Sequence, residues 1–122
     1  IILTVPATTE TDGMIGSVEL AAMKPSATII NIARGTVIDQ DALVAALSEK
    51  RIGAAFLDVT SPEPLPAEHP LWNLENAHVT MHLSGRAQDK MVTRSVERFL
   101  TNLESWRNGG PIEPKVDLLL GY

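Results

Sequence analysis

Residues 28–35 read TIINIARG, a nearly continuous apolar run that ends in an arginine and a glycine. Similar apolar runs occupy residues 1–5, 53–59 and 78–82, so the four runs begin at residues 1, 28, 53 and 78. Continuous rather than alternating apolar runs are typical of buried parallel strands. The spacing leaves room for one crossover element after each of the first three runs, which predicts a β-α-β-α-β-x-β order and an α/β fold.

The first two crossovers have helical patterns. We expect a short helix over residues 15–23, between the first two runs. In the second crossover Asp39 is a suitable N-cap, and Leu43, Val44 and Leu47 form a one-sided apolar stripe. The sequence therefore predicts two helical connections of the kind that join parallel strands.

The third connection differs because it is rich in proline. Residues 60–77 read TSPEPLPAEHPLWNLENA, with proline at 62, 64, 66 and 70. Proline lacks the backbone N–H and clashes with the preceding helical turn, so we expect an ordered loop with one turn near residues 71–74. A long loop at the ligand edge of a sheet is commonly functional.

The last element is predicted to be an amphipathic helix from about Gln88 to Arg107. Its apolar stripe advances by four and then three residues along one face, and it comprises Val92, Val96, Phe99, Leu103 and Trp106. The Gly-Gly-Pro at 109–111 is expected to end the helix. The chain opens inside an apolar run without a methionine, so we expect further residues upstream.

Composition and charge narrow the class of protein. The chain has 122 residues, which suits one domain, and a formal net charge of -5 without a basic block, which argues against a nucleic-acid partner. No apolar run approaches the roughly 18 residues that a membrane helix needs. The absence of cysteine excludes disulfides and fits a cytoplasmic protein. No His or Cys cluster has metal-ligand spacing, so no metal site is expected.

Three polar residues stand just past the carboxyl ends of successive predicted strands, namely Arg34, Glu63 and His82. Ligands of open α/β sheets bind at that edge, so we expect the three side chains to meet there. A guanidinium holds a carboxylate through two parallel hydrogen bonds. Histidine exchanges a proton near neutral pH, and a neighbouring carboxylate favours its charged form. The trio has the chemistry to bind a carboxylate substrate and to move a proton at a carbonyl group.

Each of these residues also has a structural interpretation. Taken alone, Arg34 fits a surface arginine in a turn, and Glu63 fits a solvated loop residue. His82 fits a capping or buried structural histidine as well as a catalytic one. Asp58 ends an otherwise apolar strand, where a carboxylate is costly unless a ligand amide or a backbone N–H binds it. The position of these side chains in space decides between the interpretations.

Three segments, NIARGTVIDQDALVAAL, GAAFLDVTSPEPLPAEHPLW and HVTMHLSG, together resemble the D-isomer-specific 2-hydroxyacid dehydrogenases. The resemblance implies a Rossmann-like doubly wound parallel sheet, present here as the second half of the domain plus a long C-terminal helix. Residues 1–107 would be the C-terminal part of the dinucleotide-binding domain including the return helix. Residues 108–122 would be a tail that packs on the missing substrate domain or on a partner. The family's catalytic arginine, glutamate and histidine fall on Arg34, Glu63 and His82.

The resemblance also implies a dinucleotide cofactor, NAD or NADP. Its implied contacts are Val5 with Pro6 near the adenosine ribose, Ile32, Ala33 and Arg34 beside the nicotinamide, Asp58 at the carboxamide, and His82, Ser84 and Gly85 at the nicotinamide ribose. Two departures from the family pattern are Met81, where proline is usual, and Thr60, where an aromatic residue is common. The family's glycine-rich phosphate loop lies upstream of the matched region, so this stretch alone is expected to be inactive.

The implied activity is hydride transfer between NAD(P)H and a small 2-keto or D-2-hydroxy acid, in a homodimer with no nucleic-acid or membrane partner. Arg34 would hold the substrate, and His82, kept charged by Glu63, would deliver the proton. The alternative is an NAD(H)-sensing interaction protein, because the C-terminal binding protein corepressors also resemble this family.

Overall fold

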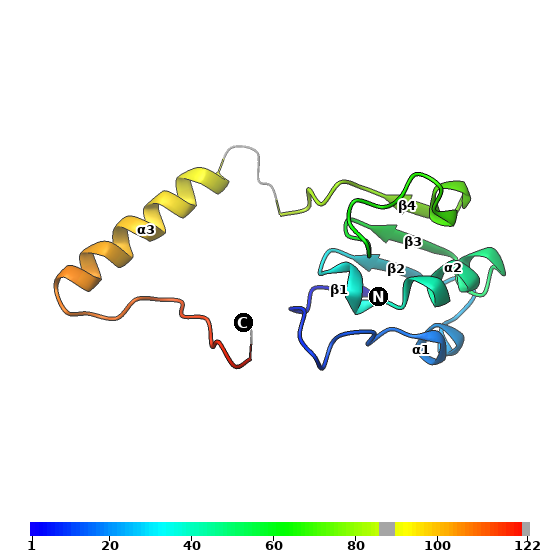
Figure 1. Cartoon of the computed structure of the whole chain (residues 1–122), viewed down its shortest axis with the longest axis horizontal. Helices are drawn as coiled ribbons and strands as arrows, with labels where there is room; N and C mark the ends of the chain where they lie inside the picture. The colour runs from blue at the N-terminus through cyan, green and yellow to red at the C-terminus, as the bar shows by residue number, and fades with distance from the viewer. Residues whose placement is uncertain (86–89, 121–122) are drawn as a thin grey trace. The chain divides into compact units, whose positions relative to one another are not determined.

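The computed structural model describes residues 1–85 and 90–120. The chain divides into two compact units, Ile1–Leu83 and Ser84–Tyr122. The first unit contains all the strands of the described chain, and the second contains one long helix (Figure 1).

A four-stranded parallel sheet organises the first unit. The strands follow one another in space in the order of the sequence, β1-β2-β3-β4, and every neighbouring pair is parallel. They are β1 (Ile2–Leu3), β2 (Thr28–Asn31), β3 (Ala54–Leu57) and β4 (Ala77–Val79). The predicted α/β fold is confirmed. Each strand is shorter than its apolar run because the run continues into the turn or loop that follows.

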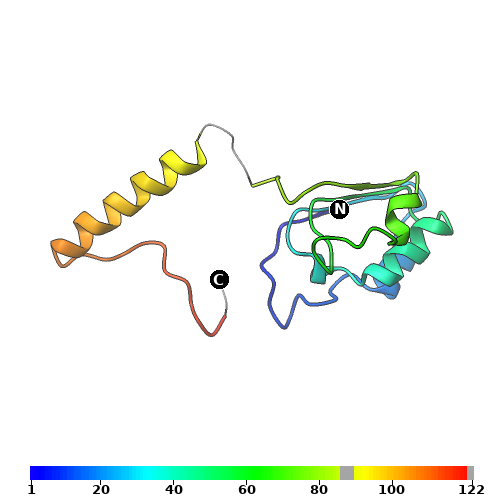
Figure 2. The ribbon, with the colours of Figure 1, turned by 45° about the horizontal axis from the view of Figure 1, so that its top comes forward.

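Two α-helices connect the first three strands and lie on the same face of the sheet (Figure 1, Figure 2). They are α1 (Ser17–Ala22) and α2 (Gln40–Ser48), in agreement with the predicted crossovers. Asp39 is the N-cap of α2, since its carboxylate accepts a hydrogen bond from the Ala42 N–H at 3.0 Å. Two short 3₁₀ helices complete the unit, η1 (Gly35–Val37) and, near the predicted turn of the proline-rich loop, η2 (Pro70–Asn73).

The hydrophobic core lies between the sheet and these two helices. α1 contributes Leu20, α2 contributes Leu43 and Leu47, and β2 contributes Ile29, all of them fully buried. Burying one such side chain is worth about 1.5–3 kcal/mol. The core therefore fixes the ends of the strands, and with them the residues that follow each strand.

The two faces of the sheet differ in burial. Leu3, Ile29 and Leu57 are at most 5% exposed and belong to the core, whereas Ile2 is 64% and Phe56 is 45% exposed. The continuous apolar runs predict strands that are buried throughout. Within residues 1–83 that prediction is wrong, because α1 and α2 cover only one face and burial alternates along each strand.

The second unit consists of α3 (Met91–Arg107) and the segment after it. The predicted apolar stripe lies on this helix, while the predicted start near Gln88 lies outside the described residues. Asn102 holds the following segment against the helix, since its Nδ2 donates to the Glu113 carbonyl oxygen and its Oδ1 accepts from the Glu113 N–H, both at 3.0 Å. Across the described part of the chain, no helix has both the length and the apolar character needed to cross a bilayer.

Candidate active site

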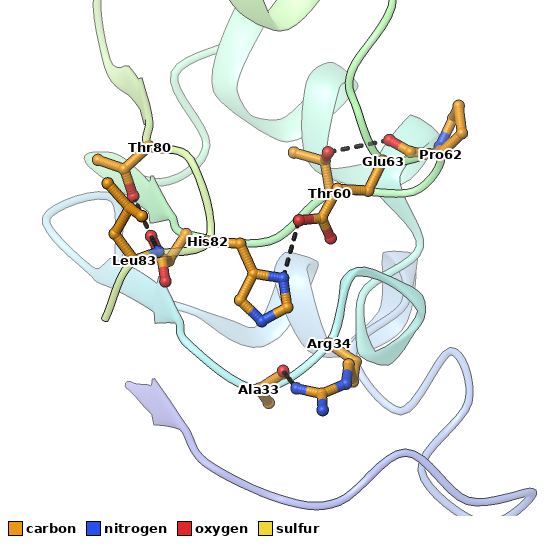
Figure 3. Close-up of polar contacts among 9 residues, drawn as sticks. Ala33, Arg34, Thr60, Pro62, Glu63, Thr80, His82 and Leu83 are labelled. Carbon is orange, nitrogen blue, oxygen red and sulfur yellow. Dashed lines mark hydrogen bonds and ion pairs between the residues drawn. The ribbon is translucent and has the colours of Figure 1, made fainter. Parts of the chain in front are cut away.

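The segments that follow β3 and β4 bring a carboxylate and an imidazole into contact. Glu63 lies in the proline-rich loop after β3, and His82 lies just after β4. The Nδ1 atom of His82 is 2.8 Å from Oε1 of Glu63 (Figure 3). The side chains of His82 and Glu63 are 44% and 40% exposed, so a ligand can reach the pair from solvent.

The main chain of His82 is held by β3. Its backbone N–H donates to the Asp58 carbonyl oxygen at 2.9 Å, which extends the pairing of β4 with β3 beyond the end of the strand. Its φ of 52° lies in the left-handed region, which residues with a side chain seldom occupy. Such conformations persist where the surroundings enforce them, and they cluster at functional sites.

The carboxylate of Asp58 fixes the residues on both sides of His82. Asp58 is only 6% exposed, and its Oδ1 accepts hydrogen bonds from the Leu83 N–H at 2.9 Å and from the Thr80 hydroxyl. The sequence predicts that a carboxylate at this strand end needs a partner such as a backbone N–H, and Leu83 supplies one. The sequence analysis does not identify Thr80. It could have been found as a hydroxyl residue close to the candidate catalytic histidine at the same strand end.

A buried asparagine shapes the turn that carries Arg34. Asn31 ends β2 and is 1% exposed. Its Oδ1 accepts a hydrogen bond from the Ala33 N–H at 3.0 Å, and its Nδ2 donates to the Arg34 carbonyl oxygen at 2.9 Å. These bonds satisfy main-chain groups that have left the sheet. Sequence reasoning misses Asn31 too, although a polar residue inside the apolar run TIIN is a usable signal.

Arg34 extends from this turn into the region below the histidine in Figure 3. Its Nη1 donates to the Ala33 carbonyl oxygen at 2.7 Å. The second ring nitrogen of His82 points toward the segment that carries Ala33 and Arg34, and the Arg34 side chain lies beside that segment (Figure 3). Within residues 1–85 and 90–120 it forms no ion pair with a carboxylate. A guanidinium has five N–H donors, so Arg34 retains donors for an anionic ligand.

Gly35 allows the Arg34 turn to approach the loop that carries Glu63. A Cβ atom at Gly35 would overlap the main-chain carbonyl group of Thr60. The backbone at Thr60 fills the space that a side chain at position 35 would need, and this close approach joins the turn after β2 to the loop after β3.

The remaining candidates for cofactor contact are apolar or small residues. Pro6, Ile32, Ser84 and Gly85 are exposed, Val5 is half-buried and Ala33 is buried, and Ser84 and Gly85 belong to the second unit. An exposed apolar side chain at Ile32, directly before the turn to Arg34, suits the flat face of a nicotinamide ring. The described residues include no group of three or more His, Cys, Asp and Glu side chains that could hold a metal ion.

The arrangement suits an anionic carbonyl compound. Arg34 can bind a carboxylate through its planar fork of donors. Glu63 occupies Nδ1 of His82, which leaves Nε2 as the ring nitrogen that can exchange a proton with a carbonyl oxygen.

Known proteins with similar sequences fit this chemistry. Residues 1–84 match the family model described as D-isomer specific 2-hydroxyacid dehydrogenase, NAD binding domain. The chain is 39% identical over 117 residues to glyoxylate/hydroxypyruvate reductase B of Pectobacterium carotovorum. That match covers 93% of this chain and 37% of the reductase.

Solved structures agree with the sequence match. A D-isomer specific 2-hydroxyacid dehydrogenase of Xanthobacter autotrophicus, in complex with NADPH and MES, is 37% identical with a TM-score of 0.90, over 99% of this chain and 49% of that one. A D-lactate dehydrogenase of Lactobacillus jensenii with NAD+ is 30% identical with a TM-score of 0.82, over 95% of this chain and 38% of that one. This chain spans less than half the length of these relatives.

Proposed function

This chain belongs to the D-isomer specific 2-hydroxyacid dehydrogenase family, and on that basis we propose that the protein interconverts a 2-keto acid and a D-2-hydroxy acid with NAD(H) or NADP(H). The observation that carries the proposal is the 2.8 Å contact between His82 Nδ1 and Glu63 Oε1, at the sheet edge that also carries Arg34. The contact joins an acid–base group to the carboxylate that orients it, beside a cation for an anionic substrate.

Arg34 binds the substrate in this mechanism. Its guanidinium takes the substrate carboxylate through two parallel hydrogen bonds and directs the adjacent carbonyl group toward the histidine. The turn that carries Arg34 is held by the buried Asn31, so the guanidinium starts from a defined position. Negative charge that develops on the carbonyl oxygen is stabilised by the same cation.

His82 is the proton donor for reduction. Glu63 orients the ring through Nδ1, and Nε2 of the protonated ring delivers its proton to the substrate oxygen. The nicotinamide cofactor, when bound, supplies the hydride. In the reverse direction the neutral imidazole accepts the hydroxyl proton, and Glu63 stabilises the charge that results. Acid–base help of this kind contributes roughly 10²–10⁴-fold in rate.

Residues at the strand ends provide the cofactor contacts in this proposal. They are Val5, Pro6, Ile32, Ala33, Arg34, Asp58, His82, Ser84 and Gly85. We assign residues 1–107 to the C-terminal part of the dinucleotide-binding domain, and residues 108–122 to a tail that packs on another domain or a partner. The match of residues 1–84 to a NAD binding domain supports the assignment of that stretch to the dinucleotide-binding domain.

Glyoxylate and hydroxypyruvate are the first substrates to test, because the related reductase of Pectobacterium carotovorum is named for them. Both compounds carry a carboxylate next to a carbonyl group, which is the pattern that Arg34 and His82 suit. The related proteins carry the names of enzymes, so we do not retain the nucleotide-sensing alternative.

The test is an assay of the full-length protein with NADH and NADPH against glyoxylate, hydroxypyruvate and pyruvate. We expect reduction of at least one acid, and a loss of kcat of roughly 10²-fold or more in His82→Gln. Consumption of neither cofactor with any of the acids would reject the proposed reaction. An unchanged kcat in His82→Gln would reject the assignment of the proton donor.

We also propose that the protein is a cytoplasmic homodimer. The absence of cysteine suits a reducing compartment. Large apolar side chains are exposed in the second unit, among them Phe99 and Trp106 on α3, and exposed apolar surface of this kind is common at subunit contacts. Size-exclusion chromatography with light scattering should give twice the mass of one full-length chain, and a monomer mass would contradict the proposal.

A further inference from the structure

We propose that Gln40, the first residue of α2, is a positioning residue for the Glu63–His82 pair. The inference rests on the proposed function, because it concerns how the acid of that reaction is held in place. Gln40 does not contact either member of the pair. It acts on the main chain of Ser61, which lies two residues before Glu63.

The amide of Gln40 binds both main-chain groups of Ser61. Its Nε2 donates to the Ser61 carbonyl oxygen at 2.8 Å, and its Oε1 accepts from the Ser61 N–H at 3.0 Å. A planar amide that makes two hydrogen bonds to one residue fixes the orientation of that residue as well as its position. Gln40 and Ser61 are both half-buried, so water competes less for these bonds than it would on an open surface.

These two bonds connect an exposed loop segment to a helix that is packed against the core. Residues 62–64 are exposed and belong to no helix or strand, and Glu63 is in the middle of them. α2 is anchored in the core by Leu43 and Leu47. Gln40 therefore ties the loop that carries the carboxylate to the best-packed helix of the unit. A functional side chain on a loop needs such support to keep its geometry.

His69 also contacts the Gln40 amide, but it cannot be the group that orients it. Gln40 Nε2 lies 3.1 Å from His69 Nε2, and the Leu71 N–H donates to His69 Nδ1 at 3.2 Å. Both partners are donors, and a neutral imidazole has an acceptor lone pair on only one of its nitrogens. His69 thus satisfies one of the two donors at a time. The bonds to Ser61 have one donor and one acceptor each, so they set the orientation of the amide.

The direct readout is the tautomer of His82 in the 122-residue chain. A carboxylate on Nδ1 holds the neutral ring in its Nδ1–H form, since the partner of one ring nitrogen decides where the proton resides. Long-range ¹H–¹⁵N correlation spectra distinguish the Nδ1–H and Nε2–H forms when recorded at a pH at which the ring is neutral. The His82 signals are identified by their absence in His82→Gln.

Four variants separate the positioning role from a general loss of structure. In Glu63→Ala we expect His82 to lose its preference for the Nδ1–H form, which calibrates the signal. Gln40→Ala should change it in the same direction. Gln40→Glu keeps an acceptor for the Ser61 N–H but puts an oxygen against the Ser61 carbonyl, so its signal should lie between those of the parent and Gln40→Ala. Asp41→Ala changes an exposed neighbour in the same helical turn and should leave the parent spectrum unaltered.

Two results would overturn the inference. One is a parent-like tautomer in Gln40→Ala together with a changed tautomer in Glu63→Ala. The other is an Nε2–H form in the parent chain itself, because the pair would then not exist. The spectra do not depend on turnover, so a full-length protein that reduces no keto acid would reject the proposed function and leave this result standing.

Steady-state kinetics of the full-length protein give a second test of the positioning role. We expect Gln40→Ala to lower kcat for keto-acid reduction by on the order of 10- to 100-fold, the size of effect seen when a catalytic group is displaced by about 1 Å. The KM for the nicotinamide cofactor should stay within about twofold, because Gln40 contacts none of the proposed cofactor residues. A raised cofactor KM with an unchanged kcat would contradict the positioning role.

Discussion

Replacing Asn31 by alanine removes both hydrogen bonds that shape the turn before Arg34. The side chain is almost completely buried, and its two partners differ in what they would keep. Ala33 is buried, so its N–H would be left as an unsatisfied donor. The Arg34 carbonyl oxygen would keep its second hydrogen bond, from the Val37 N–H at 3.2 Å.

The expected cost follows from this difference. A buried N–H without a partner costs about 1–3 kcal/mol, and one lost hydrogen bond to a carbonyl that keeps another partner costs about 0.5–1.5 kcal/mol. The sum has a central value of about 3 kcal/mol, which would lower the Tm of a domain of this size by roughly 12–24 °C. The released turn would also misplace Arg34, so the KM of the full-length protein for the keto acid should rise.

Urea unfolding of the 122-residue chain, followed by circular dichroism, measures the change in unfolding free energy. Asn76→Ala is a matched control, because among the described residues the side chain of the half-buried Asn76 makes one hydrogen bond, from Nδ2 to the Leu47 carbonyl oxygen at 3.2 Å. The control should lose about 1 kcal/mol or less. If Asn31→Ala costs no more than Asn76→Ala, the turn does not depend on the buried amide and the reasoning is refuted.

Three further substitutions test other parts of the site. Arg34→Lys removes the planar fork, so the KM of the full-length protein for the keto acid should rise about tenfold or more; an unchanged keto-acid KM would exclude Arg34 from carboxylate binding. Thr80→Val removes the hydroxyl that donates to Asp58 near His82 and should lower kcat about tenfold. Thr80→Ser keeps a hydroxyl and should have the kcat of the parent. Equal kcat values in the two variants would contradict the role of the hydroxyl. Gly35→Ala places a Cβ against the Thr60 carbonyl group and should lower the unfolding free energy by about 1–3 kcal/mol in urea titration; a change below about 0.5 kcal/mol would show that the two segments are not in close contact.

The part of the site that the sequence predicts is the part that topology dictates. Parallel strands end at the same edge of a sheet, so three strand-like runs with short crossovers are enough to place the residues that follow them on one side. The contact of Glu63 with His82 is an instance, since these residues are far apart in the chain and each follows a neighbouring strand. Helix α2 is predictable for a local reason, because Asp39 caps it and its apolar stripe has the helical period.

Of the residues that the sequence does not predict, Asn31 and Gln40 act through main-chain atoms, and Thr80 acts through the Asp58 carboxylate. Asn31, Gln40 and Thr80 matter because of the atoms that come within hydrogen-bonding distance of them after the loops have taken their final path. The path of the loops cannot be predicted from the spacing of residues along the chain. The close approach at Gly35 is not predictable for the same reason, because only the fold brings the Thr60 main chain against this glycine. Apolar runs likewise do not tell which face of a strand will be covered, as the exposed Phe56 demonstrates.

Gln40 binds Ser61 through its main-chain carbonyl oxygen and N–H, which nearly every amino acid has. These hydrogen bonds therefore do not depend on the side chain at position 61. A library that varies this position, with Gln40 left untouched, would sample new side chains two residues from Glu63 on an unchanged loop. Such a library offers a route to altered substrate preference that does not begin by loosening the catalytic carboxylate.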